Sequence, residues 1–165
     1  MGCEISSIEG KIKGENHAKL FAEIYNSVMS EKEDWFESEN ELSFDMFDEE
    51  DDEYTFETDT YGVFEDPYET ALRVVAAEFV KAAPDAEFEM TYDISWDNSY
   101  ENWTEEYTYS RKRLKIEFID NFNSDGQEYI EGIGYGPYET ETYCLSYKDG
   151  AFEVIEGSKE ILNTL

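Results

Sequence analysis

The alternation of hydrophobic and polar residues over the first hundred positions predicts strands and helices in turn. Residues 3–13 are typical of a strand, and a change in the phase of their apolar positions at Ser6–Ser7 indicates a β-bulge. Residues 16–30 repeat apolar side chains at helical spacing behind Asn16, which can cap the helix. The apolar stripe of this helix consists of Leu20, Phe21, Ile24, Tyr25 and Val28.

Two further strands are expected on either side of six consecutive acids, Asp48–Glu53. Residues 41–47 and residues 54–60 each carry an apolar side chain at every second position, which is the period of a half-buried strand. The acids would then form the loop of a hairpin. The apolar positions are Leu42, Phe44 and Met46 in the first strand and Tyr54 and Phe56 in the second.

A second helix is expected from residue 66 to a point before Pro84. Asp66 can cap it, Pro67 suits the first helical position and Glu69 completes a capping box. Its inner face carries Leu72, Val75, Ala76, Phe79 and Val80. Residues 86–96 then alternate strictly, and the apolar phase of this strand consists of Ala86, Phe88, Met90, Tyr92, Ile94 and Trp96.

The resulting βαββαβ order predicts an α+β fold with a ferredoxin-like core at residues 1–97, in which two helices pack on one face of a four-stranded antiparallel sheet. Residues 98–165 are expected to extend this core as an antiparallel β meander, with strands near 104–118 and 127–134 and a hairpin at 140–155. Ser158 can cap a short C-terminal helix. We expect the chain, residues 1–165, to form a single domain.

The stretch AAEFVKAAPDAEFEMTYD resembles the helix, Pro-Asp turn and strand of ferredoxin-like domains found in phage and plasmid proteins. The resemblance covers about residues 67–118. It implies a fold and no particular activity.

The net charge of the chain is more informative about function than any of its motifs. The chain has 42 acids and 12 bases, a net charge of −30, and 18 of the acids lie between Glu31 and Glu69, where Lys32 is the single base. Such a surface attracts cationic partners and is repelled by nucleic acid and by anionic membranes. Halophilic or general solubility adaptation is the main alternative, although 29 Glu against 13 Asp and the uneven distribution speak against it.

Candidate catalytic and metal-binding groups are few. His17 is the single histidine, Cys3 and Cys144 are the two cysteines, and neither a P-loop nor a dinucleotide-binding motif occurs, so we expect no enzyme activity, cofactor or metal site. Residues 121–126 match the first half of an EF-hand loop, but position 12 is Gly132, which favours a plain loop.

The cellular location is expected to be the cytoplasm. The chain has too few cysteines for a disulfide framework and no apolar run long enough for a signal peptide or a transmembrane helix. Residues 1–6 fit an N-acylation pattern, but no basic cluster follows, and the start of the first strand is the simpler interpretation.

The bases gather in one cluster, formed by Arg111, Lys112, Arg113 and Lys115. Leu114, Ile116 and Phe118 occupy the alternate phase, so the cluster is expected on one face of a strand. We expect it to neutralise acids on a neighbouring strand.

Acids held at fixed spacing on a sheet can imitate the charge of a nucleic acid, because strands place alternate carboxylates about 6.6 Å apart. This predicts an inhibitor that occupies the basic nucleic-acid-binding surface of a host nuclease or defence complex, with tyrosines that stack on partner arginines. In general character it resembles the anti-restriction and anti-CRISPR proteins of phages and mobile elements. The expected partner-binding residues are Asp45, Asp48, Glu49, Glu50, Asp51, Asp52, Glu53, Tyr54, Glu57, Asp59 and Tyr61.

Three alternatives remain open on the same residues. The first is an immunity protein that blocks a basic nuclease toxin. The second is a calcium-buffering or cation-responsive protein that uses residues 48–53 and 121–131. The third is a soluble acidic domain of unrelated function.

Overall fold

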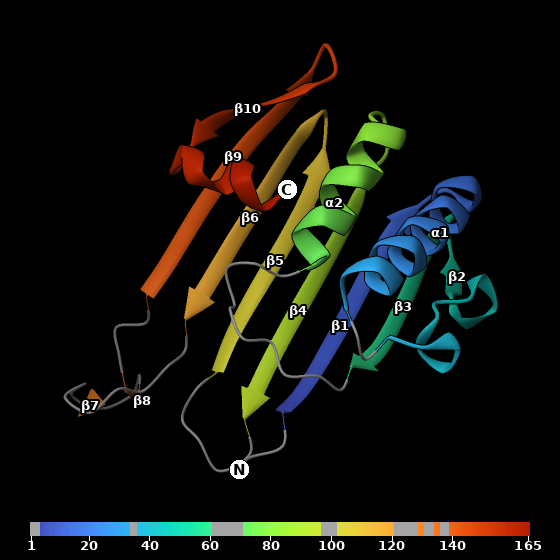
Figure 1. Ribbon diagram of the computed structural model, residues 1–165, viewed down its shortest axis with the longest axis horizontal. Helices are drawn as coiled ribbons and strands as arrows, with labels where there is room; N and C mark the ends of the chain where they lie inside the picture. The colour runs from blue at the N-terminus through green and yellow to red at the C-terminus, as the bar shows by residue number, and fades with distance from the viewer. Residues whose placement is uncertain are drawn as a thin grey trace.

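A long antiparallel sheet dominates the computed structural model, which describes residues 4–33, 36–60, 71–96, 102–120, 129–130, 134–135 and 139–165. The strand order of this eight-stranded sheet is β10-β9-β6-β5-β4-β1-β3-β2 (Figure 1). Its strands are β1 (Glu4–Lys13), β2 (Asp48–Glu50), β3 (Glu53–Thr60), β4 (Phe88–Trp96), β5 (Asn102–Ser110), β6 (Arg113–Asp120), β9 (Glu139–Lys148) and β10 (Ala151–Glu156). A separate ladder joins β7 (Tyr129–Ile130) to β8 (Gly134–Tyr135).

The described helices cover one face of the sheet and leave the other face open. In Figure 1, α1 (Glu15–Lys32) lies over β1 and β3, and α2 (Ala71–Ala82) lies over the centre of the sheet. The 3₁₀ helix η3 (Lys159–Thr164) covers β6 and β9 on the same side, and two further 3₁₀ turns, η1 (Ser38–Asn40) and η2 (Phe44–Met46), lie beside the β2 edge. The predicted α+β class with helices on an antiparallel sheet is therefore confirmed.

The sheet is larger than the four-stranded sheet that a ferredoxin-like core predicts. Strand β5 pairs with β4 along residues 102–109, and β6, β9 and β10 follow without a break. The strands after residue 98 therefore extend the sheet that contains β1–β4. Pairing β4 with β5 satisfies the backbone N–H and C=O groups that a four-stranded sheet would leave at this edge.

The hairpin and helix expected near the C-terminus are both present. Strands β9 and β10 turn at Asp149 and Gly150, which have φ angles of 52° and 79°. The hydroxyl of Ser158 accepts a hydrogen bond from the backbone N–H of Glu160 at 3.3 Å and so caps η3. The capping box expected at residues 66–69 lies outside the described residues.

Two local predictions in the first strand and helix are wrong. The register of β1 against both neighbours runs without a shift through Ser6 and Ser7, so there is no bulge. Ile8 and Ile12 are buried on the helix-covered side within this unshifted register. Helix α1 begins at Glu15, so Asn16 lies inside the helix and does not cap it. The N-cap residue is Gly14, whose φ of 92° is a conformation that glycine adopts readily.

The predicted strand at residues 41–47 is also wrong. Residues 44–46 form the 3₁₀ turn η2 instead. The side-chain amide of Asn26 donates to the carbonyl of Leu42 at 2.9 Å, and the N–H of Leu42 donates back to the Asn26 side chain at 2.7 Å. These two bonds satisfy the backbone of Leu42 as a neighbouring strand would, so pairing starts later, at Asp48.

The core forms between the helices and the inner face of the sheet, as the apolar phases predict. The rings of Phe21 in α1 and Phe79 in α2 pack edge to face, with their centroids 5.2 Å apart. The centroid of Phe79 also lies 5.2 Å from that of Phe88 in β4. Met90 and Tyr92 are buried on the same phase of β4. Their burial confirms the register assigned to residues 86–96.

One ion pair lies inside this core, between Arg73 of α2 and Glu105 of β5. Their side chains are 2% and 0% exposed, and Arg73 Nε and Nη2 both lie 2.6 Å from the same oxygen, Glu105 Oε1. Arg73 Nη1 donates to the hydroxyl of Thr164 at 3.3 Å, and the guanidinium faces the ring of Tyr143 at 5.9 Å. The pair therefore joins α2, the middle of the sheet and the C-terminal turn.

Breaking this pair from one side is expected to destabilise the fold strongly. Arg73→Met or Glu105→Leu alone leaves an uncompensated buried charge and should lower the free energy of unfolding by about 3–5 kcal/mol in urea titrations. The double variant Arg73→Met/Glu105→Leu removes both charges and should be more stable than either single variant. Losses that simply add would contradict the assignment of an interacting buried pair.

Candidate functional site

The open face of the sheet carries an ordered pattern of charge. Because side chains alternate along a strand, the burial of Ile8 and Ile12 in β1 places Ser7, Glu9 and Lys11 on the open side. From β3 to β9 the strands pair in continuous register, so residues that face one another form rows that run across this part of the sheet.

One of these rows contains two pairs of directly opposed glutamates. From β3 to β6 it reads Glu57, Glu9, Thr91, Glu106 and Glu117. We call its four glutamates, Glu57, Glu9, Glu106 and Glu117, the acidic row. Opposed residues have Cβ atoms about 4.5–5.5 Å apart, where like charges destabilise a sheet. The fold does not need carboxylates at these positions.

The rows on the two sides of the acidic row differ in how their charge is compensated. The row that contains Asp59, Ser7, Asp93 and Thr104 includes no base, and neither does the acidic row, over the strands that the structure describes from β3 to β9. Asp93 accepts a hydrogen bond from the hydroxyl of Thr104 at 2.7 Å.

At the opposite end of the strands, lysines balance the acids. Lys11 Nζ lies 3.4 Å from Glu53, and Lys13 Nζ lies 3.5 Å from Glu87. Among the described residues, lysines therefore compensate the negative charge of the open face near the β2–β3 turn, and no base lies in the acidic row or in the row beyond it.

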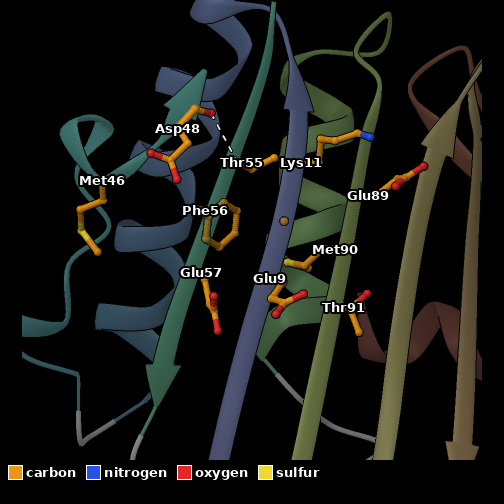
Figure 2. A pocket seen from close by; sticks show the side chains of 11 residues that line it. Glu9, Lys11, Met46, Asp48, Thr55, Phe56, Glu57, Glu89, Met90 and Thr91 are labelled. Carbon is orange, nitrogen blue, oxygen red and sulfur yellow. Dashed lines mark hydrogen bonds between the residues drawn. The ribbon is translucent and has the colours of Figure 1, made fainter. Parts of the chain in front are cut away.

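A shallow groove of about 430 Å³ lies at the β3–β1–β4 part of this face (Figure 2). Figure 2 shows Glu9 and Glu57 on neighbouring strands at one end of the groove, with Lys11 and Glu89 toward the other. Asp48, Thr55 and Thr91 complete its polar lining, and Met46 of η2 forms a rim. The arrangement can bind cationic side chains, because carboxylates outnumber the single lysine.

Gly10 provides the floor of the groove. The ring of Phe56 packs against β1 at this position, where a Cβ atom would lie 2.3 Å from Phe56 Cε1. A residue without a side chain therefore lets a buried aromatic ring lie directly beneath the open face.

The six acids Asp48–Glu53 do not form the predicted hairpin loop. Three of them form the edge strand β2, and Asp51 and Asp52 form a two-residue turn with φ angles of 51° and 63°. Positive φ at both central positions is the hairpin geometry that suits the strand twist, and aspartate tolerates it better than most residues. The N–H of Gly14 donates to the carbonyl of Asp52 at 2.8 Å and ties the turn to α1.

Strand β2 divides the acids between the two faces. Asp48 and Glu50 pair with Thr55 and Glu53 on the open side, and Glu49 pairs with Tyr54 on the helix side. Glu49 Oε1 accepts a hydrogen bond from the N–H of Asp52 at 3.3 Å. An exposed, charged edge strand of three residues also protects the sheet against edge-to-edge association.

The remaining predicted binding residues lie apart from one another. Tyr54 is half-buried on the helix side against Phe44, with ring centroids 5.6 Å apart, so its ring does not share a face with Glu57. Burial, followed by the charges of Glu15, Glu49 and Asp52, raises the pKa of Tyr54. Asp45 is exposed in η2, Asp59 lies in β3 opposite Ser7, and Tyr61 lies outside the described residues.

Three members of the acidic row were missed by the sequence reasoning, because Glu9, Glu106 and Glu117 lie outside the acid-rich segment of residues 31–69. Each occupies the polar phase of its strand, which is a signal that could have found them. Their assembly into one row depends on which strands are neighbours.

The prediction that the basic cluster neutralises facing acids on neighbouring strands is wrong. Arg111 and Lys112 form the β5–β6 turn, with φ angles of 51° and 62°. Arg113 pairs with Ser110 and Ser146, and Lys115 pairs with Thr108 and Cys144. An acid reaches this cluster only at the turn among the described residues, where Lys112 Nζ lies 3.9 Å from Asp85.

Other candidate chemistry is sparse in the described part of the chain. His17 is half-buried, and its ring lies edge to face with that of Phe79, with the two ring centroids 6.4 Å apart. Among the described residues, no group of three or more His, Cys, Asp or Glu side chains could hold a metal ion, and residues 121–128 are not among them. No described helix combines the length and the hydropathy that a membrane span requires.

Comparison with known proteins provides no assignment: no family model, curated protein or solved structure matches the chain.

Adding a methyl group at Gly10 tests the packing beneath the groove. Gly10→Ala should lower the free energy of unfolding by about 1–3 kcal/mol, because the new Cβ overpacks against Phe56. Combining it with Phe56→Leu makes room for the methyl group. The double variant should then be less destabilised than the sum of the two single variants, by at least about 0.5 kcal/mol in denaturant titrations. Strictly additive effects would contradict the contact.

Removing one charge from an opposed pair should stabilise the fold. Glu57→Gln relieves repulsion with Glu9 and should raise the free energy of unfolding by about 0.2–1 kcal/mol at low salt. The gain should shrink at physiological salt, as the melting temperature of the unmodified protein rises through screening. Glu153→Gln is the matched control, because Glu153 is an exposed strand residue opposite Ser146. An equal gain in the control would mean that net charge, and not the opposed pair, sets the cost.

Proposed function

We propose that this protein is an acidic decoy that occupies the basic nucleic-acid-binding surface of a host defence enzyme, in the manner of anti-restriction or anti-CRISPR inhibitors. The observation that supports this most is the acidic row, which places glutamates opposite glutamates on an uncovered sheet face. Such pairs cost stability. Lys and Arg side chains of a binding partner would relieve the repulsion between these glutamates and be attracted to them.

The sheet provides charge at fixed positions. Glu57 and Glu117 lie four strands apart, which at about 4.8 Å per strand spans roughly 19 Å. The backbone ladder holds this spacing before binding, so the partner does not have to order a flexible acidic segment. The net charge of −30 would steer encounter with a basic groove and make association fast and salt-sensitive.

The same charge would determine several further properties of the protein. The protein would act by binding, without catalysis or a cofactor, and would not itself bind nucleic acid or membrane. It would work in the cytoplasm. We further propose that β1–β4 with α1 and α2 correspond to a ferredoxin-like unit, which is supported by the adjacency β4-β1-β3-β2, and that the later strands extend it.

The test is competition for an enzyme. Basic nucleic-acid-binding proteins are captured from host lysate on the immobilised protein at low salt, and one captured enzyme is purified and loaded with a fluorescent oligonucleotide. Titrating the acidic protein should release the oligonucleotide, and higher salt should weaken the release. Binding that leaves the oligonucleotide in place would contradict the decoy mechanism.

Charge-matched variants locate the surface. Replacing the four glutamates of the acidic row with Gln should weaken competition by about 10- to 100-fold, at up to about 1 kcal/mol for each solvated contact. Glu23, Glu31, Glu39 and Glu160 are exposed and lie on helices away from the open face. Changing these four to Gln gives the same net charge and should alter competition by less than about threefold. An equal weakening of competition in both variants would mean that net charge, and not the position of the acidic row, determines binding.

A third variant separates the acidic row from the β2–β3 hairpin. Changing the six acids Asp48–Glu53 to Asn and Gln keeps their shape and removes their charge. Because three of them lie on the open face or its edge, this variant should weaken competition as well. No loss in it, together with a loss in the acidic-row variant, would confine the binding surface to the part of the open face around the acidic row.

A further inference from the structure

The open face also carries a positively charged corner, at the ends of β5, β6 and β9. Five of the 12 bases of the chain lie there: Arg111, Lys112, Arg113, Lys115 and Lys148. The backbone N–H of Tyr147 donates to the carbonyl of Lys112 at 2.9 Å, which ties the β5–β6 turn to β9. The corner is therefore a fixed part of the sheet.

Most bases elsewhere in the protein are already paired with acids, whereas at the corner Lys112 alone has an acidic partner among the residues that the structure describes. Lys11, Lys13, Lys19, Arg73 and Lys81 each lie within 3.5 Å of a carboxylate oxygen. By contrast, Arg111, Arg113 and Lys115 form no ion pair with any acid that the structure describes. In a chain with 42 acids, three adjacent bases without such a partner are unexpected.

The residues around these three bases carry hydroxyl groups. Arg113 lies between Ser110 and Ser146, and Lys115 lies beside Thr108. A concavity of about 620 Å³ opens here, and its lining consists of Thr108, Ser110, Arg111, Arg113 and Lys115. The lining contains hydrogen-bond donors and positive charge and no carboxylate.

The β5–β6 turn does not require bases for its own stability. Arg111 and Lys112 have φ angles of 51° and 62°, in a region that costs an ordinary residue roughly 1 kcal/mol or more. The equivalent turn between β9 and β10 uses Asp149 and Gly150, which are the residues that this geometry favours. Bases at the first turn therefore point to a role other than folding.

We propose that Arg111, Arg113 and Lys115 form a binding site for a phosphate group, either free or as a small monoester. Guanidinium groups match the oxygens of phosphate with paired hydrogen bonds, and the ammonium of Lys115 adds a point charge. The hydroxyls of Thr108 and Ser110 can donate to the remaining oxygens. The net charge of −30 repels long polyanions, so the site suits a single phosphate group. It goes beyond the proposed decoy function and does not depend on it.

The three arginines of the chain make a direct test possible. In ¹⁵N-labelled protein, the side-chain Nε–Hε signals of Arg111 and Arg113 are followed by NMR during titration with inorganic phosphate, adenosine monophosphate or acetate at constant ionic strength. Phosphate and the monophosphate should each produce a saturable shift at Arg111 and Arg113. Arg73, buried against Glu105, serves as the internal reference and should not shift. Tighter binding of the monophosphate would identify a monoester as the preferred form, tighter binding of inorganic phosphate would identify the free anion, and equal binding would show that the site recognises the phosphate group alone.

Two charge-matched variants complete the test. Arg113→Gln/Lys115→Gln should weaken phosphate binding at least about tenfold, as read from Arg111, because two charged donors are lost. Lys11→Gln/Lys13→Gln makes the same change in charge on the same face, at bases that already have acidic partners, and should leave the affinity unchanged. Shifts that do not saturate, that acetate reproduces, or that persist in the first variant would overturn the site.

Discussion

Every side chain on the open face is placed by the burial of its neighbours on the helix-covered face. The period of a strand is two, so the inward positions of Ile8, Phe56 and Ile116 dictate that Glu9, Glu57 and Glu117 point away from the core. A shift of one residue in any strand would bury carboxylates and expose the aromatic cluster. The hydrophobic core therefore fixes the charge pattern as firmly as it fixes the fold.

This constraint lets a chain with a net charge of −30 hold like charges close together. Repulsion across one opposed pair is small compared with the burial of rings such as Phe21, Phe79 and Phe88, each of which contributes about 1.5–3 kcal/mol. The acids that the structure describes, apart from Glu105, are placed where water and salt can screen them. The buried pair of Arg73 and Glu105 is the exception, and there a guanidinium at 2.6 Å replaces the solvent.

Elements with a clear apolar period were predictable from the sequence, and contacts between distant segments were not. The alternation of Phe88, Met90 and Tyr92 was sufficient to assign β4 and its inner face. Residues 41–47 alternate in the same way, but they form no strand. The side chain of Asn26 makes hydrogen bonds with both the N–H and the C=O of Leu42. Such a long-range hydrogen bond has no signature in local periodicity.

The candidate site shows the same limit. Asp48–Glu53 were predicted to bind a partner because a run of like charges is visible in a sequence. The acidic row combines one residue from each of four strands, and Glu9 and Glu106 are unremarkable where they stand in the chain. Strand order and register bring them together, and both are set by tertiary pairing. The phase of each residue was predictable, and its neighbours across the sheet were not.

The two charged regions of the open face together restrict how a basic partner could approach. A positive groove is attracted to the acidic row and repelled by Arg111, Arg113 and Lys115, which lie at the far end of β5 and β6. The favourable footprint is therefore centred on β3, β1 and β4, over the groove lined by Glu9 and Glu57, and extends along the row toward β6. An anion held at the positive corner would weaken that repulsion and enlarge the accessible footprint. An anion bound at the corner would then change the orientation in which the partner binds, while changing the total charge of the protein only slightly.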